Sequence, residues 1–365
     1  MRNTSFLRMR PSALVLSRNC AEAQRFVAAA GRSLCASYGV EDFSFGKISF
    51  HHYSITFPCT LLKSGSEIRG YGKIPKSDPS KRSVTQLNEA DRVLAKNEYT
   101  SLEYLRDHWP GSKFGVNFVT PLAFVESSNL LITEELPGEH LHAQMRRRLL
   151  KKKLSFGSVG GDPLVPCFAR IGKALGAFHR EHRAPKNAIA ASVADKLIST
   201  SKAIHRQTGI DLALVVNACI GEDVLEILNN TQAKTMKGFD IRNIIVDGRE
   251  CINIIDPGKI KVDTALADVA RFIVTIRLVF WGSWYCPLIV SEVDEYEDAF
   301  IDAWRSESGL ATDGLSILVI KEVLRYWLIG LDAAARYAPN TLLESALKRY
   351  YVNRVFLRML AMHTQ

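Results

Sequence analysis

The sequence predicts a two-lobed α+β fold, with a small antiparallel sheet in the N-terminal lobe and a larger, helical C-terminal lobe. Residues 42–76 alternate between apolar and polar side chains and are rich in β-forming residues, as antiparallel strands are. From residue 136 onward, apolar residues instead recur at the spacing of amphipathic helices. These observations place the lobes at 42–135 and 136–365, after a basic leader and helix at 1–41.

Size and composition fit a globular protein with a large core. The chain has 365 residues, of which 47% are hydrophobic and 23% charged. Its seven cysteines are an odd number and contain no C-x-x-C pair, which favours a reducing compartment over a disulfide framework or a zinc site. No apolar run of about eighteen residues is free of charge, so no membrane span is expected. The expected location is the cytoplasm.

The N-terminus leaves a second location open. Four Arg, three Ser and no acidic residue precede Glu22, which is the composition of an organellar transit peptide. The apolar run at 13–16 is too short for a secretory signal. The other interpretation is a structured, basic leader that continues into a helix at 21–38.

The N-terminal lobe is predicted to have the order β-β-β-α-β-β. Three strands are expected within residues 42–76, with a KSGS turn between the second and the third. A helix follows at 84–106, where leucines recur along one stripe. Two further strands are expected at 121–127 and 129–139. The lobe is therefore one antiparallel sheet with at least one covering helix.

Glu98 lies in the middle of the leucine stripe of that helix. A carboxylate on a buried helix face needs a cationic partner, and the preceding strand offers Lys73 or Lys76. An ion pair between helix and sheet is therefore predicted. The alternative is a surface ion pair in an ordinary α+β domain.

The C-terminal lobe is predicted to consist mainly of helices. A loop rich in Gly precedes an amphipathic helix at 167–182, and two more helices are expected within 189–230. The region from 265 to the C-terminus is helical throughout. His179 and His182 lie in the first of these helices without an acidic residue at a fitting distance, so core or capping roles are favoured over metal binding.

A short hairpin in this lobe carries the strongest chemical signal. Two apolar, β-branched runs at 244–246 and 251–255 flank an Asp-Gly dipeptide, which is typical of a tight turn. The hairpin brings Asn243, just before its first strand, next to Asp256, just after its second. An amide oxygen and a carboxylate are hard oxygen ligands that suit Mg²⁺ bound to nucleotide phosphates. The sequence therefore predicts a metal and phosphate site at this hairpin end.

This segment resembles the catalytic loop of the aminoglycoside phosphotransferase and small-molecule kinase family. That loop has the pattern H-G-D-x-x-x-x-N, and the next metal-binding Asp follows thirteen residues after the Asn. Asn243 and Asp256 keep this spacing. The H-G-D triplet, however, falls on Met236, Lys237 and Gly238, so a glycine replaces the catalytic carboxylate.

The resemblance implies a protein-kinase-like fold that binds ATP and Mg²⁺. In that fold a strand Lys pairs with a helix Glu to hold the nucleotide phosphates, and these positions match Lys73 and Glu98, with Lys76 as the second choice. The last predicted strand of the N-terminal lobe and the residues after it resemble the hinge that contacts adenine through backbone groups, at Glu134, Glu135 and Leu136.

Two further positions follow from the resemblance. The turn at residues 51–53 takes the place of a glycine-rich loop, which is missing from the sequence together with any Walker-type motif. Asp268 matches an Asp that braces the backbone of the catalytic loop; the alternative is an exposed acid on a helix.

Asp240 is the carboxylate closest to the emptied catalytic position at Gly238. It precedes Asn243 by three residues rather than the family's five, so it is a candidate for a displaced catalytic base. The resemblance implies an ATP-dependent phosphotransferase that acts on a hydroxyl of a small molecule, such as a sugar or glycan precursor. The alternative is a catalytically inactive, nucleotide-binding protein that acts through protein interaction. A third interpretation is an unrelated α+β binding protein with a chance hairpin.

The formal net charge is +9, and one segment supplies six of the positive charges. Three interpretations are open for it: a solvated helix face, attraction of an anionic substrate or glycan, or peripheral contact with an anionic membrane. Aromatic residues are not interleaved with the charges, so nucleic acid is not the expected partner. The cations are Arg146, Arg147, Arg148, Lys151, Lys152 and Lys153.

Overall fold

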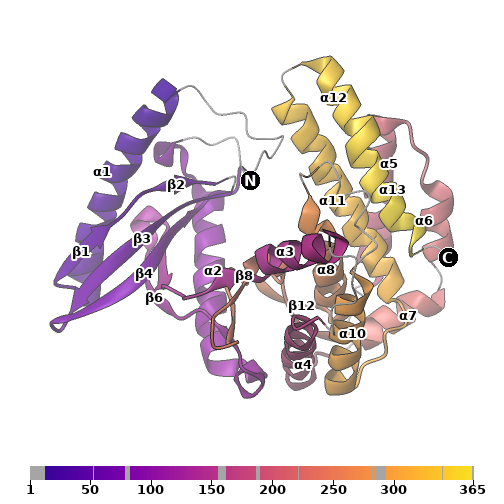
Figure 1. Ribbon diagram of the computed structural model, residues 1–365, viewed down its shortest axis with the longest axis horizontal. Coiled ribbons are helices and arrows are strands. Elements are labelled where there is room, and N and C mark those ends of the chain that lie inside the picture. The colour runs from indigo at the N-terminus through magenta and orange to yellow at the C-terminus, as the bar shows by residue number, and fades with distance from the viewer. Residues whose placement is uncertain are drawn as a thin grey trace.

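The computed structural model has two lobes that lie side by side (Figure 1). The N-terminal lobe contains an antiparallel sheet and the C-terminal lobe is largely helical, so the predicted α+β fold class is confirmed. Residues 1–12 of the expected leader lie outside the described residues. The structure describes residues 13–51, 53–78, 83–154, 162–185, 190–220, 222–281, 283, 293–338 and 340–363.

Six strands form the antiparallel sheet of the N-terminal lobe, in the order β1-β3-β4-β7-β6 with β2 paired to β3. The first predicted strand is in fact two short strands, because the chain leaves the sheet at Gly46, where a Cβ atom would lie 2.9 Å from the Pro58 ring. The strands are β1 (Asp42–Phe45), β2 (Ser49–Phe50), β3 (Ser54–Lys63), β4 (Ser66–Pro75), β6 (Pro121–Val125) and β7 (Leu130–Glu134).

The long hairpin of β3 and β4 turns at the predicted KSGS segment. Ser64 and Gly65 both have positive φ angles, of 51° and 72°. A turn with two successive positive φ angles matches the right-handed twist of the flanking strands. Glycine adopts a positive φ without strain. The turn sets the register in which Thr56 pairs with Lys73.

Two helices, α1 (Ala13–Tyr38) and α2 (Glu89–His108), cover opposite faces of this sheet (Figure 1). Side chains alternate between faces along a strand. On β7, Leu130 and Ile132 share one apolar cluster with Val27 of α1, whereas Leu131 shares another with Leu102 of α2. The sheet is thus buried on both sides.

Helix α2 begins at a capping box. The Asn88 side chain accepts a hydrogen bond from the backbone N–H of Asp91, and the Asp91 side chain accepts one from the backbone N–H of Asn88. This arrangement satisfies backbone donors that a helix leaves unpaired at its N-terminus. The cap places the helix start later than the predicted residue 84, where the chain forms a short 3-10 turn instead.

The C-terminal lobe packs its helices around one large apolar core. Helices α4 and α10 approach closely because Gly172 and Gly176 face the backbone of α10; a Cβ atom at Gly172 would lie 2.3 Å from the carbonyl oxygen of Phe300. Among the described residues, no helix has both the length and the apolar composition that a membrane span requires. The helices are α3 (Leu141–Leu154), α4 (Val165–Glu181), α5 (Ala190–Thr208), α6 (Ala213–Cys219), α7 (Glu222–Asn230), α8 (Leu266–Arg277), α10 (Asp294–Ser308), α11 (Leu315–Tyr337), α12 (Thr341–Leu347) and α13 (Asn353–Ala361).

The C-terminal lobe also contains two small sheets, one of which includes the predicted hairpin. The hairpin forms as expected, with Ile244 opposite Ile254. It extends into a four-stranded sheet of order β5-β11-β10-β8, and a separate two-stranded sheet pairs β12 with β9. The strands are β5 (Val116–Phe118), β8 (Glu139–His140), β9 (Gln232–Met236), β10 (Ile244–Val246), β11 (Ile252–Ile254) and β12 (Ile260–Thr264).

Candidate active site

A cavity of about 500 Å³ opens between the sheet of the N-terminal lobe and the hairpin of the other lobe. The lining residues come from both lobes, and Asp240 is not one of them. The cavity brings together every other residue that the sequence predicted for the site: Lys73, Glu98, Glu134, Glu135, Leu136, Asn243 and Asp256.

Lys73 is the centre of this cavity. It lies opposite Leu131 in the β4–β7 register, so its side chain points to the face of the sheet that α2 covers. Its Nζ donates to both carboxylate oxygens of Glu98, at 2.8 and 2.9 Å, and lies 2.7 Å from Oδ2 of Asp256. The predicted ion pair between helix and sheet is therefore present, and it uses Lys73 rather than Lys76.

The two carboxylates differ in exposure. The Glu98 side chain is 5% exposed, whereas that of Asp256 is 41% exposed and faces the cavity. Burial lowers the pKa of Lys73, but the charges of Asp256 and Glu98 outweigh burial and raise it. Burial and the neighbouring Asp256 raise the pKa of Glu98 above its ordinary value. Two carboxylates share one ammonium, so a cation bound beside Asp256 would reduce the repulsion between them.

Asn243 and Asp256 lie at the open end of the hairpin, as predicted. The Asn243 Nδ2 donates to the carbonyl oxygens of Gly238 and Asp256, at 2.9 and 3.3 Å. Because the nitrogen is directed at the backbone, the amide oxygen is the atom left to act as a ligand. Asp256 has a φ of 55°, in the left-handed region that Asp tolerates. The amide and carboxylate oxygens fit a hard cation such as Mg²⁺.

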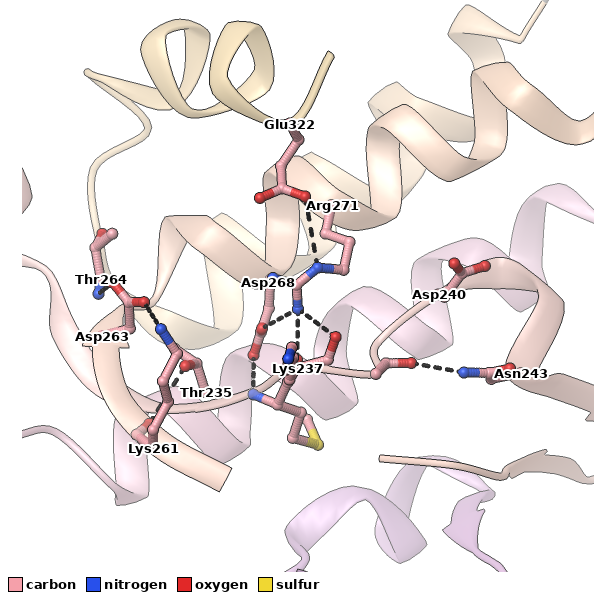
Figure 2. A network of polar contacts seen from close by, with 12 residues as sticks. Thr235, Lys237, Asp240, Asn243, Lys261, Asp263, Thr264, Asp268, Arg271 and Glu322 are labelled. Atoms are coloured by element: carbon pink, nitrogen blue, oxygen red, sulfur yellow. Dashed lines mark hydrogen bonds and ion pairs between the residues drawn. The ribbon is translucent and has the colours of Figure 1, made fainter. Parts of the chain in front are cut away.

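The backbone of the candidate catalytic loop is held by side chains of α8 (Figure 2). Asp268 is 1% exposed, and it accepts a hydrogen bond from the backbone N–H of Met236 at 2.8 Å. The interpretation of Asp268 as a backbone brace is therefore confirmed over that of an exposed acid. Arg271 adds a second clamp, because its guanidinium donates to the carbonyl oxygens of Met236 and Lys237, both at 2.8 Å.

His179 of α4 supports Asp268 from behind and is a buried core residue. The indole N–H of Trp304 donates to its Nδ1 at 3.0 Å, and an indole nitrogen has no acceptor capacity. The imidazole proton is therefore on Nε2, which lies 3.3 Å from Oδ2 of Asp268. Within the described part of the chain, no group of three or more His, Cys, Asp or Glu could hold a metal.

Gly238, which the resemblance aligns with a catalytic Asp of the family, has no space for a side chain. A Cβ atom there would lie 2.0 Å from the carbonyl oxygen of Asp256 and 2.7 Å from the carbonyl carbon of Pro257. Its backbone N–H donates to the carbonyl oxygen of Pro257 at 2.8 Å. The catalytic loop and the segment of Asp256 are thus in direct backbone contact, and this contact requires a glycine.

Asp240 is engaged with its own loop. Its Oδ1 accepts hydrogen bonds from the backbone N–H and the Nε of Arg242, both at 2.9 Å, and its Oδ2 accepts from the Arg242 guanidinium and from the Tyr326 hydroxyl. Burial raises the pKa of Asp240, but the hydrogen bonds and charge of Arg242 outweigh burial and hold the pKa below its ordinary value. In Figure 2 its carboxylate points away from the Asn243 amide.

The predicted hinge residues lie at the end of β7, but two of their backbone donors are already used. The N–H of Glu134 donates to Thr120 at 3.0 Å, and the N–H of Glu135 donates to Arg69 at 3.1 Å. A nucleotide base would therefore take its hydrogen bonds from the carbonyl groups or from the region of Leu136. Apolar side chains that suit a planar base also line this cavity: Leu102, Val119, Leu131, Ile245 and Ile255.

The basic segment lies on α3 and does not form one exposed patch. Arg146 is half-buried and lines a second cavity, while Arg147 pairs with Glu139. Arg148 and Lys151 are exposed. The side chains of residues 152–153 lie outside the described residues.

Sequence reasoning missed Arg271, Arg242 and Tyr326. Arg271 follows Asp268 by three residues, so the pair lies on one face of α8, and that spacing was an available signal. Tyr326 contacts the loop from α11, which is distant in the sequence, so no residue spacing indicated that the two would meet.

No protein-family model matches this sequence, and no curated protein matches it. Solved structures do match. The choline kinase from Cryptosporidium parvum Iowa II has a TM-score of 0.53 at 12% identity, covering 93% of this chain and 94% of that chain. The choline kinase LicA from Streptococcus pneumoniae has a TM-score of 0.48 at 10% identity, covering 91% and 99%.

A third match is the spectinomycin phosphotransferase APH(9)-Ia, solved with ADP and spectinomycin. Its TM-score is 0.48 at 11% identity, and the match covers 93% of this chain and 98% of that chain. The match to the choline kinase from Cryptosporidium parvum thus extends over most of the chain. The predicted protein-kinase-like fold is confirmed.

Replacing Glu98 with Ala should destabilise the protein by ~1 to 3 kcal/mol, because the partly buried Lys73 ammonium loses its helix partner. Chemical denaturation measures the change in the free energy of unfolding. A matched control is Glu126→Ala, which removes an exposed ion pair with Lys96 and should cost less than about 1 kcal/mol. Equal effects of the two substitutions would contradict the central role of the Lys73 pair.

Replacing Gly238 with Ala should destabilise the protein by ~1 to 3 kcal/mol, because the new Cβ atom would overlap backbone atoms that have nowhere to move. Thermal or chemical denaturation tests this. Gly248→Ala is the control, since nothing lies within 4 Å of a Cβ atom there. For the same reason Gly238→Asp should not create a working catalytic aspartate; an active, stable Gly238→Asp protein would refute the backbone contact.

Proposed function

We propose that this protein binds Mg-ATP in the cavity between the lobes and transfers the terminal phosphoryl group to a hydroxyl of a small molecule. The observation that carries the proposal is the meeting of Lys73 with Glu98 and Asp256, through contacts of 2.7 to 2.9 Å. Asn243 lies beside Asp256 at the same hairpin end. The fold shared with choline kinase supports a hydroxyl acceptor, and a sugar or glycan precursor fits this chemistry.

Each residue has a distinct part in this proposal. Phosphoryl transfer depends mainly on positioning and on charge neutralisation. Glu98 orients the Lys73 ammonium, which contacts the nucleotide phosphates once the Asp256 carboxylate turns from Lys73 to the metal. Asn243 and Asp256 would hold Mg²⁺, which neutralises phosphate charge when bound. Asp268 holds the start of the loop at Met236, and the Asn243 amide is held by the carbonyl oxygen of Gly238.

The proton of the acceptor hydroxyl needs a base, and Asp240 is the candidate. Its carboxylate has to leave Arg242 before it can take a proton, and its lowered pKa makes it a weak base in the present arrangement. A general base contributes typically ~10² to 10⁴ in rate, so slow transfer without one remains chemically reasonable. This proposal therefore predicts a slow enzyme unless Arg242 moves.

A second candidate function is nucleotide binding without turnover, with the protein acting through interaction. The specific observation that favours it is Gly238, where the family's carboxylate is absent and no side chain fits. Both candidates require the same Mg-nucleotide site. Turnover alone separates them.

The protein should bind ATP more tightly with Mg²⁺ than without it, and Asp256→Ala should remove this metal dependence. The reason is that Asp256 is the exposed carboxylate of the site. Calorimetric titration of ATP with Mg²⁺ or with EDTA measures the effect. Asp302→Ala, an exposed acid on α10, is the control. Metal-independent ATP binding by the parent protein would contradict the assignment of Asp256 as a metal ligand.

If the protein turns over ATP, Asp240→Asn should lower kcat by roughly 10² or more and leave ATP affinity nearly unchanged, as loss of a general base does. Steady-state kinetics and ATP calorimetry on the same variant test this. Full turnover by Asp240→Asn would exclude it as the base. Tight Mg-ATP binding without ATP consumption, over a panel of sugars, amino sugars and glycan precursors, would favour the inactive protein.

A further inference from the structure

A second cavity, of about 250 Å³, adjoins the nucleotide cavity on the side of the C-terminal lobe. Arg242 lines both cavities, and it directly precedes Asn243 in the loop. A molecule in the second cavity would therefore lie next to the proposed phosphoryl donor. The walls come from α3, α8, α11 and α13 and from the segment after α8, at His142, Arg146, Arg242, Thr275, Leu278, Val279, Trp281, Tyr326, Ile329, Gly330, Ala333 and Phe356.

The charge of this cavity is positive. Its lining contains Arg146 and Arg242 and no acidic residue among the described residues. Arg242 is neutralised by Asp240, but within the described part of the chain no carboxylate lies at ion-pairing distance from Arg146. The Arg146 guanidinium instead donates to the Ser283 hydroxyl at 3.2 Å and lies 5.6 Å from the centre of the Phe280 ring. Arg146 therefore leaves an uncompensated positive charge at the cavity.

His142 responds to this charge. Burial, together with the neighbouring His140, Arg146 and Arg242, lowers the pKa of His142 to about 4. The imidazole is therefore neutral near pH 7 and can both donate and accept a hydrogen bond. Its Nδ1 is buried and has no hydrogen-bond partner among the described residues.

The rest of the cavity is apolar and aromatic. Leu278, Trp281, Ile329 and Phe356 contribute to its walls, and Tyr326, whose hydroxyl donates to Asp240, lines it as well. The cavity volume is below the ~300 Å³ at which sites for drug-sized ligands begin. An occupant would therefore be small, with one charged end at the arginines and a short carbon skeleton against the apolar wall.

We propose that this cavity binds the phosphoryl acceptor and that the acceptor is a small hydroxylated anion, with a carboxylate or a phosphate as its charged group. This inference rests on the proposed function, because it takes the adjoining cavity to hold Mg-ATP. Arg146 and Arg242 match a planar carboxylate or a phosphate. An ammonium-bearing acceptor would meet Arg146 without a lining carboxylate to stabilise it.

Occupation of the cavity bears on Asp240 as well. An anion that binds Arg242 competes with Asp240 for the same guanidinium. The Asp240 carboxylate is then less tightly held, which is the change that a role as base requires. The acceptor thus loosens the ion pair that restrains the candidate base.

Binding of four small probes without nucleotide tests the inference: glycerol, D-glycerate, glycerol 3-phosphate and choline, at equal, low ionic strength. D-Glycerate and glycerol 3-phosphate should bind at least about tenfold more tightly than glycerol and choline, as measured by calorimetry and by thermal shift. Arg146→Gln should weaken binding of both anions by about tenfold or more. Arg148→Gln, an exposed arginine on the same helix, should leave it unchanged.

The outcomes are distinct. Preference of the parent protein for choline over the anions overturns the proposal, and this result needs no variant. Equal anion affinity in Arg146→Gln and in the parent also overturns it. Lys73→Met should lose Mg-ATP binding and keep anion binding, because Lys73 lines the other cavity. Mg-ATP binding without anion binding refutes the anionic acceptor alone, whereas anion binding without Mg-ATP binding refutes the proposed function and, with it, the acceptor role.

Discussion

The ion pair between Lys73 and Glu98, extended to Asp256, is the interaction on which the site depends. It joins three segments that are far apart in the chain: a central strand, the helix on one face of its sheet, and the end of a hairpin in the other lobe. A partly buried ammonium is stabilised by its partners, and each partner constrains the position of its own segment. The contact with Asp256 thereby relates the two lobes to each other as well as forming the cavity between them.

Under the proposed function, the groups for nucleotide binding and the candidate group for proton transfer lie in different surroundings. The cation, the amide and the exposed carboxylate lie where a nucleotide and its metal would need them. The position of the base is filled by a backbone contact at Gly238, and the nearest carboxylate of the loop, Asp240, is held by Arg242 and Tyr326. The proposed nucleotide binding would therefore use groups that are already in place, whereas the proposed proton transfer would require Asp240 to leave Arg242.

Local patterns in the sequence predicted the hairpin and the ion pair of the candidate site. The Asp-Gly turn between β-branched runs was sufficient for the hairpin, and with it for the neighbourhood of Asn243 and Asp256. Glu98 within an apolar stripe was sufficient for a buried ion pair, because a buried charge needs compensation. The first inference depends on the conformation of a two-residue turn, and the second on the side chains along one face of one helix. Both can therefore be made from residues that are close in the sequence.

The remaining features depend on contacts between distant segments. The strands β5 and β8 are short, and they exist because the hairpin offers them edges to pair with. The ion pair of Asp240 with Arg242 spans two residues, yet the Tyr326 hydroxyl that completes it comes from α11. Arg146 belongs to a run of cations that resembles a solvated helix face, and it lines a cavity because other helices close over it. No local sequence pattern specifies these contacts between distant segments.

The hold of Asp268 and Arg271 on the loop has a consequence for how this chain can diverge. Both side chains bind main-chain groups of residues 236 and 237, and Gly238 is bonded through its own N–H to Pro257. Main-chain groups are the same whatever the side chain, so these hydrogen bonds do not depend on the polar signature side chains of the family pattern; at residue 236 an apolar side chain still packs into the core. Signature residues can therefore be replaced at these positions while the backbone path is retained. Structural similarity can then be detected where the sequence motif is no longer present.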